Sequence, residues 1–409
     1  LTAVSSSSGA SPVSTRAISA SSSSRFLRRS AVRFTGSVWV PALICSSSAN
    51  SVSKRDSVPT NGRSISDISQ ATAFSVDGVS TSLGTVAGPT LYQGAGGQLP
   101  ALSAIGGTNS LVSMDAMEEF RIQTSSFAPE FGRLPGGQIN IATRSGTNQL
   151  HGTGFEYFRH DAMNANEWFA NRAGLPKAKE RSNDFGGVLG GPIVRNRTFF
   201  FGSYEGQRIR QPITINTVVP SAAVRAAAPA SQQVFIAAFP NPTGAALADG
   251  SAPFVATSTN PASVDATSVK VDQRGSKFVL FGRYSYSPSS SENRGGIAGI
   301  SAVSSTTLKT ATAGLTYTFS SRVLNDLRLN YSVNDVTSHT ESISLGGSVP
   351  LTEAVLPPGT NSKTGYIGYV LVSGTSIAGA YYGGFAQAIA KQYNVVDTLS
   401  LNLQRHQVK

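Results

Sequence analysis

The 409-residue chain is rich in strand and turn formers: 13% of its residues are charged, 40% are hydrophobic, and 41 are glycines. This composition favours an all-β class over a helical one. The single cysteine, Cys45, excludes an internal disulfide framework, and four histidines leave little material for a metal site.

The net charge of +11 is concentrated at the start of the chain. Residues 1–65 contain eight Lys or Arg and one acidic residue, Asp56, which leaves 25 of the 33 basic and 21 of the 22 acidic side chains for the rest. A body with nearly balanced charge has no electrostatic demand for a polyanion. We therefore expect no nucleic-acid partner.

Residues 1–60 form a low-complexity, Ser- and Arg-rich segment with 19 serines and no period of 2 or 3.6. Such a segment cannot bury enough apolar surface to offset the entropy lost on ordering. We expect it to be disordered or non-native, and composition does not separate the two. Within it, Phe34–Cys45 has the length of a signal-peptide core but begins late and lacks a clean cleavage site.

The pattern of residues 61–148 predicts a compact α+β unit of short strands and glycine turns. "FSVDGVS", from Phe74, predicts a strand that ends in an Asp-Gly turn. A glycine-rich loop follows. "MDAMEEFRIQTSSF" then predicts a short helical turn, with Asp115 near its start, that leads into a strand from Phe120. "GGQINIATRSGTN" adds an alternating strand.

After Asn148 the chain shows strands of about ten residues with strict two-residue alternation. One face of the segment 312–319 is apolar, and so is one face of 326–334. The apolar faces carry Ala313, Leu315, Tyr317 and Phe319 in the first segment and Leu327, Leu329, Tyr331 and Val333 in the second. The opposite faces carry Thr312, Gly314, Thr316 and Thr318, and Asp326, Arg328, Asn330, Ser332 and Asn334.

The connections between the predicted strands alternate between long and tight. The strands fall near 151–160, 183–194, 198–209, 267–273, 277–287, 308–320, 322–336 and 391–402. Long connections (161–182, 210–266, 288–307, 337–390) alternate with tight turns near Asn196, at 273–276 and at 320–322. This order is typical of a transmembrane β-barrel. A β-sandwich would bury its apolar faces in a shared core and show no fixed order of loop lengths.

These segments resemble the Oar-like TonB-dependent outer-membrane receptors. The similarity is carried by "FSVDGVS", by "MDAMEEFRIQTSSFAPEFGRLPGGQINIATRSGTNQLHGTGFEYFRHDAMNANEWF" and by "RSNDFGGVLGGPIVRNRTFFFGSYEGQR". "KFVLFGRYSYS" and the final "VVDTLSLNLQRHQVK" look like later strands of the same barrel. The resemblance spans roughly 61–409 and is most specific over 114–208.

The resemblance implies a mainly β protein in the bacterial outer membrane. It assigns a small α+β plug domain to 61–148 and the start of a truncated antiparallel transmembrane β-barrel to 149–409, about 8 strands of a 22-strand type. It implies a receptor that moves a large or scarce solute, such as a carbohydrate or a metal chelate. The implied partners are outer-membrane lipids and the TonB energy-transducing complex. We expect the isolated chain to aggregate through its unpaired strand edges.

No motif for covalent chemistry is present, so we expect neither an enzyme nor a cofactor. P-loop, His-Glu-x-x-His and Gly-x-Ser-x-Gly patterns are missing from the sequence, and "GAGGQL" lacks dinucleotide-binding spacing. His151, Glu156 and His160 do not complete a tetrahedral zinc set. We therefore predict no catalytic residue and no metal. The alternative function is that of a secreted or surface β-sandwich adhesin that binds glycans.

Two groups of residues are candidates for binding. Charges on the surface of the plug would contact the barrel wall: Glu118, Glu119, Arg121, Glu130 and Arg133. Polar and aromatic residues of the glycine-rich loop and of the first long connection would contact the solute: Tyr92, Gln93, Gln98, Asn109, Asn164, Asn166, Trp168 and Phe169. Trp168 and Phe169 are equally consistent with stacking on a sugar and with an interfacial aromatic belt.

The segment 131–161 marks the boundary between the two parts. We expect Ser145–Asn148 to be the hinge and Leu150–His160 the first wall strand. Phe155 and Tyr157 should face lipid, while Gly152 and Gly154 leave room for the plug on the opposite face.

Overall fold

The computed structural model describes residues 73–84, 101–123, 137–294, 299–373, 376–403 and 406–408. The chain divides into two compact units, Leu1–Leu43 and Ile44–Lys409, and all described residues belong to the second. The prediction for residues 1–60 lies outside the described part. No helix among the described residues is long and apolar enough to cross a bilayer.

A small sheet forms from the first described segments. Its strands, in the order β2-β1-β4-β3, are β1 (Ala73–Val76), β2 (Val79–Ser80), β3 (Met117–Gln123) and β4 (Gln138–Thr143). β1 runs parallel to β4, and the other pairs are antiparallel. Asp77 and Gly78 make the predicted turn with φ of 50° and 83°, values that a two-residue hairpin requires.

The short helical turn near Asp115 is also present. It is the 3-10 helix η2 (Met114–Ala116), and a second one, η1 (Thr108–Ser110), precedes it. β3 begins directly after η2, three residues before the predicted start at Phe120.

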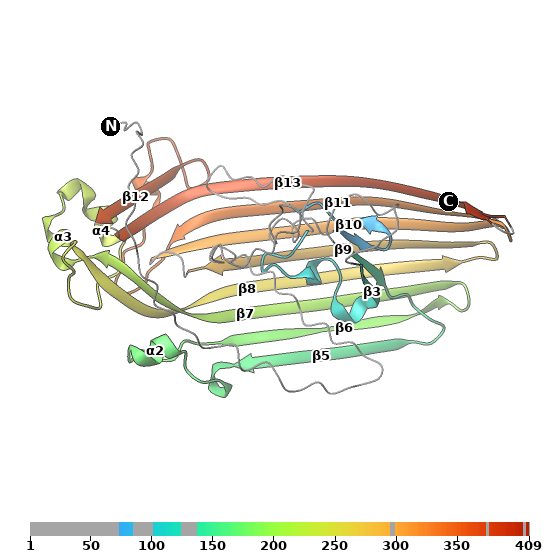
Figure 1. Ribbon diagram of the computed structural model, residues 1–409, viewed down its shortest axis with the longest axis horizontal. Helices are drawn as coiled ribbons and strands as arrows, with labels where there is room; N and C mark the ends of the chain where they lie inside the picture. The colour runs from blue at the N-terminus through green and yellow to red at the C-terminus, as the bar shows by residue number, and fades with distance from the viewer. Residues whose placement is uncertain are drawn as a thin grey trace, which may run out of the picture. The chain divides into compact units, whose positions relative to one another are not determined.

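The second sheet, called here the wall sheet, contains ten antiparallel strands (Figure 1). Strands that are neighbours in sequence pair with each other, except that β12 pairs with β13 and not with β11. The strands are β5 (His151–His160), β6 (Arg181–Val194), β7 (Thr198–Pro220), β8 (Ser251–Arg274), β9 (Phe278–Asn293), β10 (Ile300–Ser320), β11 (Val323–Ser342), β12 (Tyr366–Ser373), β13 (Ser376–Leu403) and β14 (His406–Val408).

The two ends of the wall sheet differ. At one end, the turn end, residues 195–197, 275–277 and 321–322 make tight turns. At the other, the loop end, the connections are 161–180, 221–250, 294–299 and 343–365. These connections contain η4 (Asp161–Met163), α2 (Trp168–Arg172), α3 (Ala222–Ala227), η5 (Ala230–Gln232), α4 (Gln233–Ala237) and η6 (Glu353–Val355).

Three long connections predicted from the sequence are shorter in the structure. Only 221–250 of 210–266 connects strands, most of 288–307 belongs to β9 and β10, and 337–390 contains β12, the end of β11 and the first half of β13. The extensions of β9, β10 and β11 were missed because they are Ser- and Thr-rich on both faces. They pair with each other, as Ser290 does with Ser305, and so form strands without an apolar alternation.

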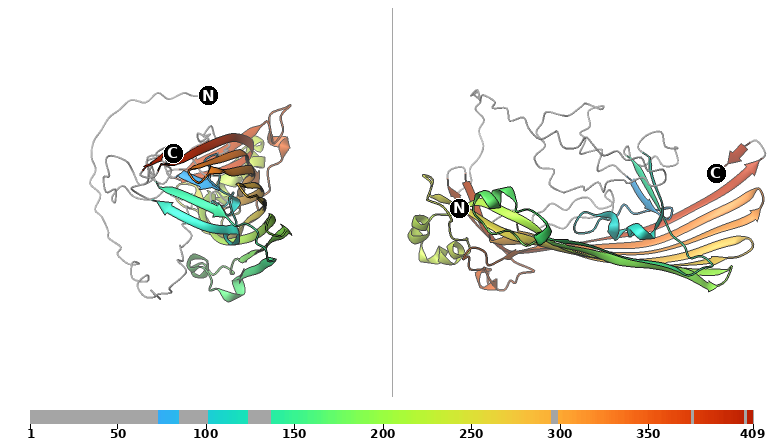
Figure 2. Two further views of the ribbon diagram at one scale, coloured as in Figure 1. Left: turned by 90° about the vertical axis from the view of Figure 1, so that its right-hand side faces the viewer. Right: turned by 90° about the horizontal axis from the view of Figure 1, so that it is seen from below.

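The strand register assigns one face of the wall sheet to the small sheet and leaves the other exposed (Figure 2). We call these the inner and the outer face. Cross-strand partners share a face, so Lys270, Arg283, Thr312 and Asn330 form one row on the inner face. The apolar side chains predicted for 313–319 and 327–333 all lie on the outer face, as the alternation indicated.

The outer face is apolar and uncovered. Its exposed side chains include Val269, Leu280, Tyr284, Tyr286, Phe319, Leu329, Tyr331, Tyr393, Val395 and Leu399. The β-sandwich of the adhesin alternative would bury this face against a second sheet, and no second sheet covers it among the described residues. An exposed apolar band of this extent is stable where lipid covers it.

The prediction for Phe155 and Tyr157 is wrong. Phe155 pairs with Gly186 and Tyr157 with Asp184, and both partners lie on the inner face. Gly152 and Gly154 are therefore on the outer face. The aromatic ring of Phe155 lies over Gly186, where a Cβ atom would come within 2.8 Å of its Cζ. The alternation of side chains in β5 was predicted correctly. The two aromatic residues were assigned to the lipid-facing side because of their hydrophobicity alone.

A compact cap closes the loop end. It consists of connections 221–250 and 343–365 together with the adjoining parts of β7, β8, β12 and β13, and we call it the loop-end cap. Phe239 and Phe254 are each 1% exposed and pack among apolar neighbours from these segments. Arg225 donates hydrogen bonds to the carbonyl oxygens of Pro220, Ile236, Phe239 and Pro240, which ties α3 to the segment after α4.

Candidate functional site

The contact between the small sheet and the inner face contains one buried ion pair. A guanidinium nitrogen of Arg283, on β9, lies 3.6 Å from a carboxylate oxygen of Asp77, in the β1–β2 turn, and the side chains are 3% and 6% exposed. The same guanidinium donates to the carbonyl of Leu111 at 2.8 Å and to the Ser268 hydroxyl at 3.1 Å. Asp77 in turn accepts hydrogen bonds from the amide and the hydroxyl of Thr143.

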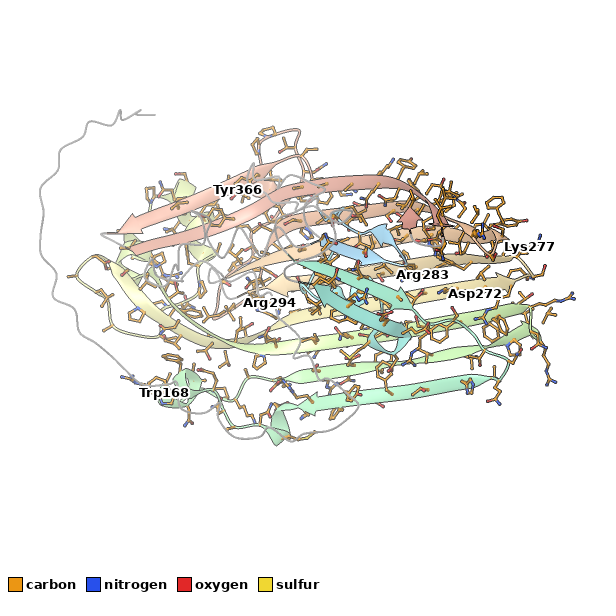
Figure 3. The ribbon with its side chains drawn as sticks, turned by 45° about the vertical axis from the view of Figure 1, so that its right-hand side comes forward. Trp168, Asp272, Lys277, Arg283, Arg294 and Tyr366 are labelled. Carbon is orange, nitrogen blue, oxygen red and sulfur yellow. The ribbon has the colours of Figure 1, made fainter. Side chains whose placement is uncertain are left out.

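A second cation lies beside this ion pair. The ammonium group of Lys270 donates to the carbonyl oxygen of Thr143 at 3.0 Å and lies 5.0 Å from the ring centroid of Phe281. The Asp272 carboxylate accepts a hydrogen bond from Ser145 at 3.2 Å. Figure 3 labels Asp272 and Arg283 on the wall strands. The end of β4 is thus held by charged side chains of the wall.

Five further polar contacts spread over four wall strands. Each pairs one group of the segments 80–84 or 101–109 with a wall side chain. They are Asn394 to the Ser80 carbonyl, Asn334 to the Leu83 carbonyl, the Ala104 amide to Ser289, Ser291 to the Ala104 carbonyl, and Asn109 to Gln207. Two of these contacts use the main chain of a single residue, Ala104, so the small sheet is held largely through its backbone.

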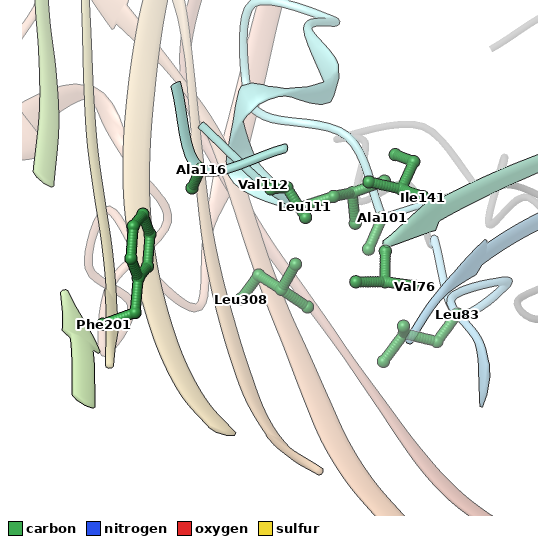
Figure 4. Close-up of a cluster of buried hydrophobic side chains, with 9 residues drawn as sticks. All are labelled: Val76, Leu83, Ala101, Leu111, Val112, Ala116, Ile141, Phe201 and Leu308. Carbon is green, nitrogen blue, oxygen red and sulfur yellow. The ribbon is translucent and has the colours of Figure 1, made fainter. Parts of the chain in front are cut away.

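Apolar contact with the wall is limited. The core of the small sheet consists of its own side chains, such as Val76, Leu111 and Ile141, and the wall adds two buried ones, Phe201 and Leu308 (Figure 4). Most of this hydrophobic core therefore stays intact if the small sheet moves away from the wall.

Such a contact is suited to separation. A hydrogen bond contributes only about 1 kcal/mol net, because water replaces the lost partner when the groups separate. Several buried oxygens of the contact, on Asn109, Glu205 and Asp272, have no hydrogen-bond partner among the described residues. The arrangement holds one sheet against another through exchangeable polar contacts.

The eight predicted ligand-binding residues fall into three groups. Tyr92, Gln93 and Gln98 lie outside the described residues. Asn109 lies at the wall, where its amide donates to Gln207 at 2.9 Å. The remaining four, Asn164, Asn166, Trp168 and Phe169, lie together on the connection 161–180 at the loop end.

The aromatic pair of this connection is exposed. Trp168 and Phe169, in α2, are 60% and 56% exposed, with ring centroids 4.9 Å apart, and Arg172 lies over the Trp168 ring. Glu167 caps the helix and accepts a hydrogen bond from Thr214 on β7. The backbone amide of Phe169 holds the pKa of Glu167 below its ordinary value. α2 is therefore anchored to the wall through its N-cap, with its rings free.

The charges predicted to contact the wall do not do so among the described residues. Glu118, Glu119 and Arg121 are exposed and form no ion pair with a described residue. The reason is that β3 is the edge strand of the small sheet and pairs with β4 alone. Glu130 and Arg133 lie outside the described residues.

Sequence reasoning missed the residues that do make the contact, namely Asp77, Lys270 and Arg283. The Asp-Gly pair was interpreted only as a turn, and the two cations were given no role beyond lying in predicted strands. A usable signal was present: Lys270 and Arg283 are charged residues on the lumen-type face of predicted membrane strands, where an ionisable group needs a partner.

Among the described residues, no group of three or more His, Cys, Asp or Glu side chains is arranged to hold a metal ion.

Comparison with known proteins agrees with this architecture. A family model described as an outer membrane beta barrel domain matches residues 142–231 and 226–409, more than half of the chain. A curated relative, the TonB-dependent transporter Oar of Myxococcus xanthus, is 32% identical over 105 residues. That match covers 25% of this chain and 10% of the relative.

Two of the solved structures to which the chain is similar come from Escherichia coli. The outer membrane transporter YddB of Escherichia coli is 12% identical, with a TM-score of 0.48, over 81% of this chain and 38% of its own. The ferric-catecholate import receptor Fiu of E. coli is 10% identical, with a TM-score of 0.37, over 83% of this chain and 51% of its own. The family model decides the assignment: the chain belongs to the outer membrane beta barrel domain family and is a protein of the bacterial outer membrane.

Proposed function

We propose that this chain is the plug and the first wall strands of a TonB-dependent transporter that carries a large or scarce solute across the outer membrane. The observation that carries the proposal is the contact described above. A small sheet with its own core is held to the polar face of a membrane wall by hydrogen bonds and one ion pair. Such a plug blocks the lumen and can be displaced without unfolding.

The proposed plug domain is 61–148 and the proposed barrel segment 149–409. The TonB complex would pull on the plug, and the connection 161–180 would contribute Asn164, Asn166, Trp168 and Phe169 to capture of the solute. The exposed rings favour a carbohydrate or an aromatic metal chelate as that solute. No covalent step and no cofactor is required.

A cysteine-labelling experiment tests plug movement without knowledge of the solute. Ser285, 5% exposed on the inner face, is changed to Cys in the full-length protein, in which Cys45 and any other native cysteine are Ser. Fluorescein maleimide should label Ser285→Cys several-fold more in energised cells than in protonophore-treated cells or in cells lacking TonB. The control, Asn171→Cys in the exposed helix α2, should be labelled equally in all three.

Labelling of Ser285→Cys that is equal under the three conditions would contradict the proposal, because it would mean that the plug does not respond to energy. Recovery of the full-length protein in the soluble periplasmic fraction, without heat-modifiable mobility, would contradict it as well.

A further inference from the structure

Three acidic side chains gather where the segment before β3 meets the wall. Glu205 on β7 and Asp184 on β6 both lie on the inner face, because Asp184 pairs with Gln207, which is two positions from Glu205. Glu205 is 6% exposed. Asp115, in the 3-10 helix η2, lies near Asp184, and η2 packs against both strands. The contact therefore brings carboxylates of the wall and of the small-sheet segment together.

No cation of the described part of the chain balances these charges. None of the ion pairs between described residues includes Glu205, Asp184 or Asp115. The nearest arginine of β7, Arg208, lies on the opposite face and donates to both carboxylate oxygens of Asp265. A buried carboxylate without a cation is unfavourable, and in a membrane strand an ionisable side chain needs a partner.

The cluster also contains buried oxygens that accept no hydrogen bond from a described residue. They are Oδ1 of Asp184 and Oε2 of Glu205 on the wall. On the small-sheet side, Ser113 is 4% exposed, and its hydroxyl lies near Glu205 but has no hydrogen-bond partner among the described residues. Buried polar atoms without partners are rare in folded proteins and call for an explanation such as a bound ion.

Neutral amides complete the surroundings of the two wall carboxylates. The side-chain nitrogen of Asn109 lies 3.5 Å from Oε1 of Glu205 and donates to Gln207 at 2.9 Å. Gln207 in turn donates to the other carboxylate oxygen of Asp184 at 3.1 Å. These weak and neutral contacts hold the carboxylates in place and leave one oxygen of each available.

The donor set fits a calcium ion. Ca²⁺ binds about six to eight oxygen atoms from carboxylates, neutral groups and water, in flexible geometry, whereas Mg²⁺ demands a near-ideal octahedron. Donors that come from β6, β7 and the segment before η2 give an irregular arrangement, which Ca²⁺ tolerates better. The set has two carboxylates, fewer than the groups of three acidic, His or Cys side chains considered above.

We propose that Asp184, Glu205 and Ser113 bind a Ca²⁺ ion that bridges the wall and the small sheet. The ion would neutralise both wall carboxylates and satisfy the buried hydroxyl. Docking of the segment 108–116 would then depend on Ca²⁺. Sequence analysis predicted no metal, because these donors are far apart in the chain. The inference rests on the contact between the two sheets and on no step of the proposed transport.

Hydrogen exchange of the purified full-length protein tests the proposal at the site itself. The protein is freed of metal with EGTA, the chelator is removed, and CaCl₂ is added back stepwise. Ca²⁺ should slow exchange of the 108–116 amides several-fold in wild type. In Glu205→Gln, the Ca²⁺ concentration at half-maximal protection should be at least about tenfold higher, since one charged ligand is lost.

A second variant distinguishes a ligand from a structural residue. Ser113→Ala removes a hydroxyl that has no hydrogen-bond partner among the described residues, so exchange without Ca²⁺ should match wild type. Its half-maximal Ca²⁺ concentration should nevertheless rise several-fold. The matched control is Glu341→Gln, an exposed glutamate on β11 of the same sheet, which should respond to Ca²⁺ like wild type.

Exchange of 108–116 that does not change when Ca²⁺ is added to wild type would overturn the proposal, and so would equal Ca²⁺ responses of wild type and Glu205→Gln. An equal response to MgCl₂ and CaCl₂ would overturn the assignment to Ca²⁺. Energised labelling of Ser285→Cys in a protein that does not respond to Ca²⁺ would overturn this inference and leave the proposed transport intact.

Heat-modifiable mobility reports whether each variant is folded. Should Glu205→Gln not fold, Asp184→Asn and Ser113→Ala decide the question, and each should need several-fold more Ca²⁺ than wild type. A wild-type Ca²⁺ response in both variants would contradict the proposal.

Discussion

The loop-end cap and the contact between the wall and the small sheet, which is the proposed plug, are both buried but consist of different kinds of side chain. In the cap, Phe239 and Phe254 pack against apolar side chains from four segments. At the plug contact, Arg283, Asp77 and Lys270 exchange hydrogen bonds across an interface to which the wall adds two buried apolar side chains. Apolar packing resists separation, whereas polar contacts can be traded for water. The small sheet can therefore separate from the wall at a lower cost in free energy than the cap can open.

The largest expected effect is in the cap. Phe254→Ala removes a ring that is 1% exposed and should destabilise the cap by about 4 kcal/mol, the usual cost of a large cavity. Hydrogen exchange of the full-length protein should show local opening of 221–250, while the plug amides keep their protection. The control, Phe319→Ala on the exposed outer face, should leave the cap unchanged. Equal protection of the cap in wild type and Phe254→Ala would contradict the claim that apolar packing of Phe254 stabilises the cap.

The second effect is at the plug. Arg283→Ala leaves the Asp77 carboxylate buried without its cation and should weaken docking of the plug by about 3 kcal/mol. Hydrogen exchange should rise in 79–84 and 139–143 and not in the cap. The double variant Asp77→Asn/Arg283→Gln should recover part of the loss, because no buried charge remains unpaired. A double variant worse than Arg283→Ala would show that the ion pair is not the source of the effect.

A smaller effect distinguishes a charge from a hydrogen bond within the same contact. Lys270→Met keeps the length of the side chain and removes its hydrogen bond to the Thr143 carbonyl, so docking should weaken by about 1 kcal/mol. Exchange of the 139–143 amides measures this change. A loss as large as that of Arg283→Ala would mean that the two cations act as one unit.

The smallest effect is pH-dependent and belongs to the cap. The amide of Ser362 donates to Glu353 at 3.0 Å, and this bond holds the pKa of the carboxyl below its ordinary value. A lowered pKa adds stability above the unfolded pKa, and the stability is lost as pH falls through the folded pKa. The protection factor of the Ser362 amide, which corrects for the intrinsic pH dependence of exchange, should therefore fall between about pH 5 and about pH 3. Glu353→Gln should remove this dependence, and an identical profile in both proteins would contradict it.

The sequence predicted the wall strands well where alternation was strict. Residues 313–319 and 327–333 lie on the predicted faces because a two-residue period fixes the side of every residue once the strand is recognised. The extensions 210–220 and 251–266 were missed, since strict apolar alternation does not run through the whole of either segment. Their pairing depends on the register of whole strands, which no local pattern contains.

The contact between plug and wall was less predictable. Asp77 and Arg283 are 206 positions apart, and nothing local to either residue names the other. Phe155 shows the same limit, because its face follows from the pairing with Gly186 and not from its hydrophobicity. The sequence predicted that charged residues contact the wall. Which ones do so depends on the strand register, which places Lys270 beside Arg283 and opposite Asp77.

The length of β7 has a consequence for whatever approaches the cell from outside. The strand continues from Tyr204, an exposed ring of the outer face, to Pro220, about 50 Å along the strand and about 40 Å in height at the usual tilt. The loop-end cap stands at the far end of this projection. An antibody raised against intact cells would meet the cap long before lipid, so the cap segments 221–250 and 343–365 are the natural epitopes of this protein.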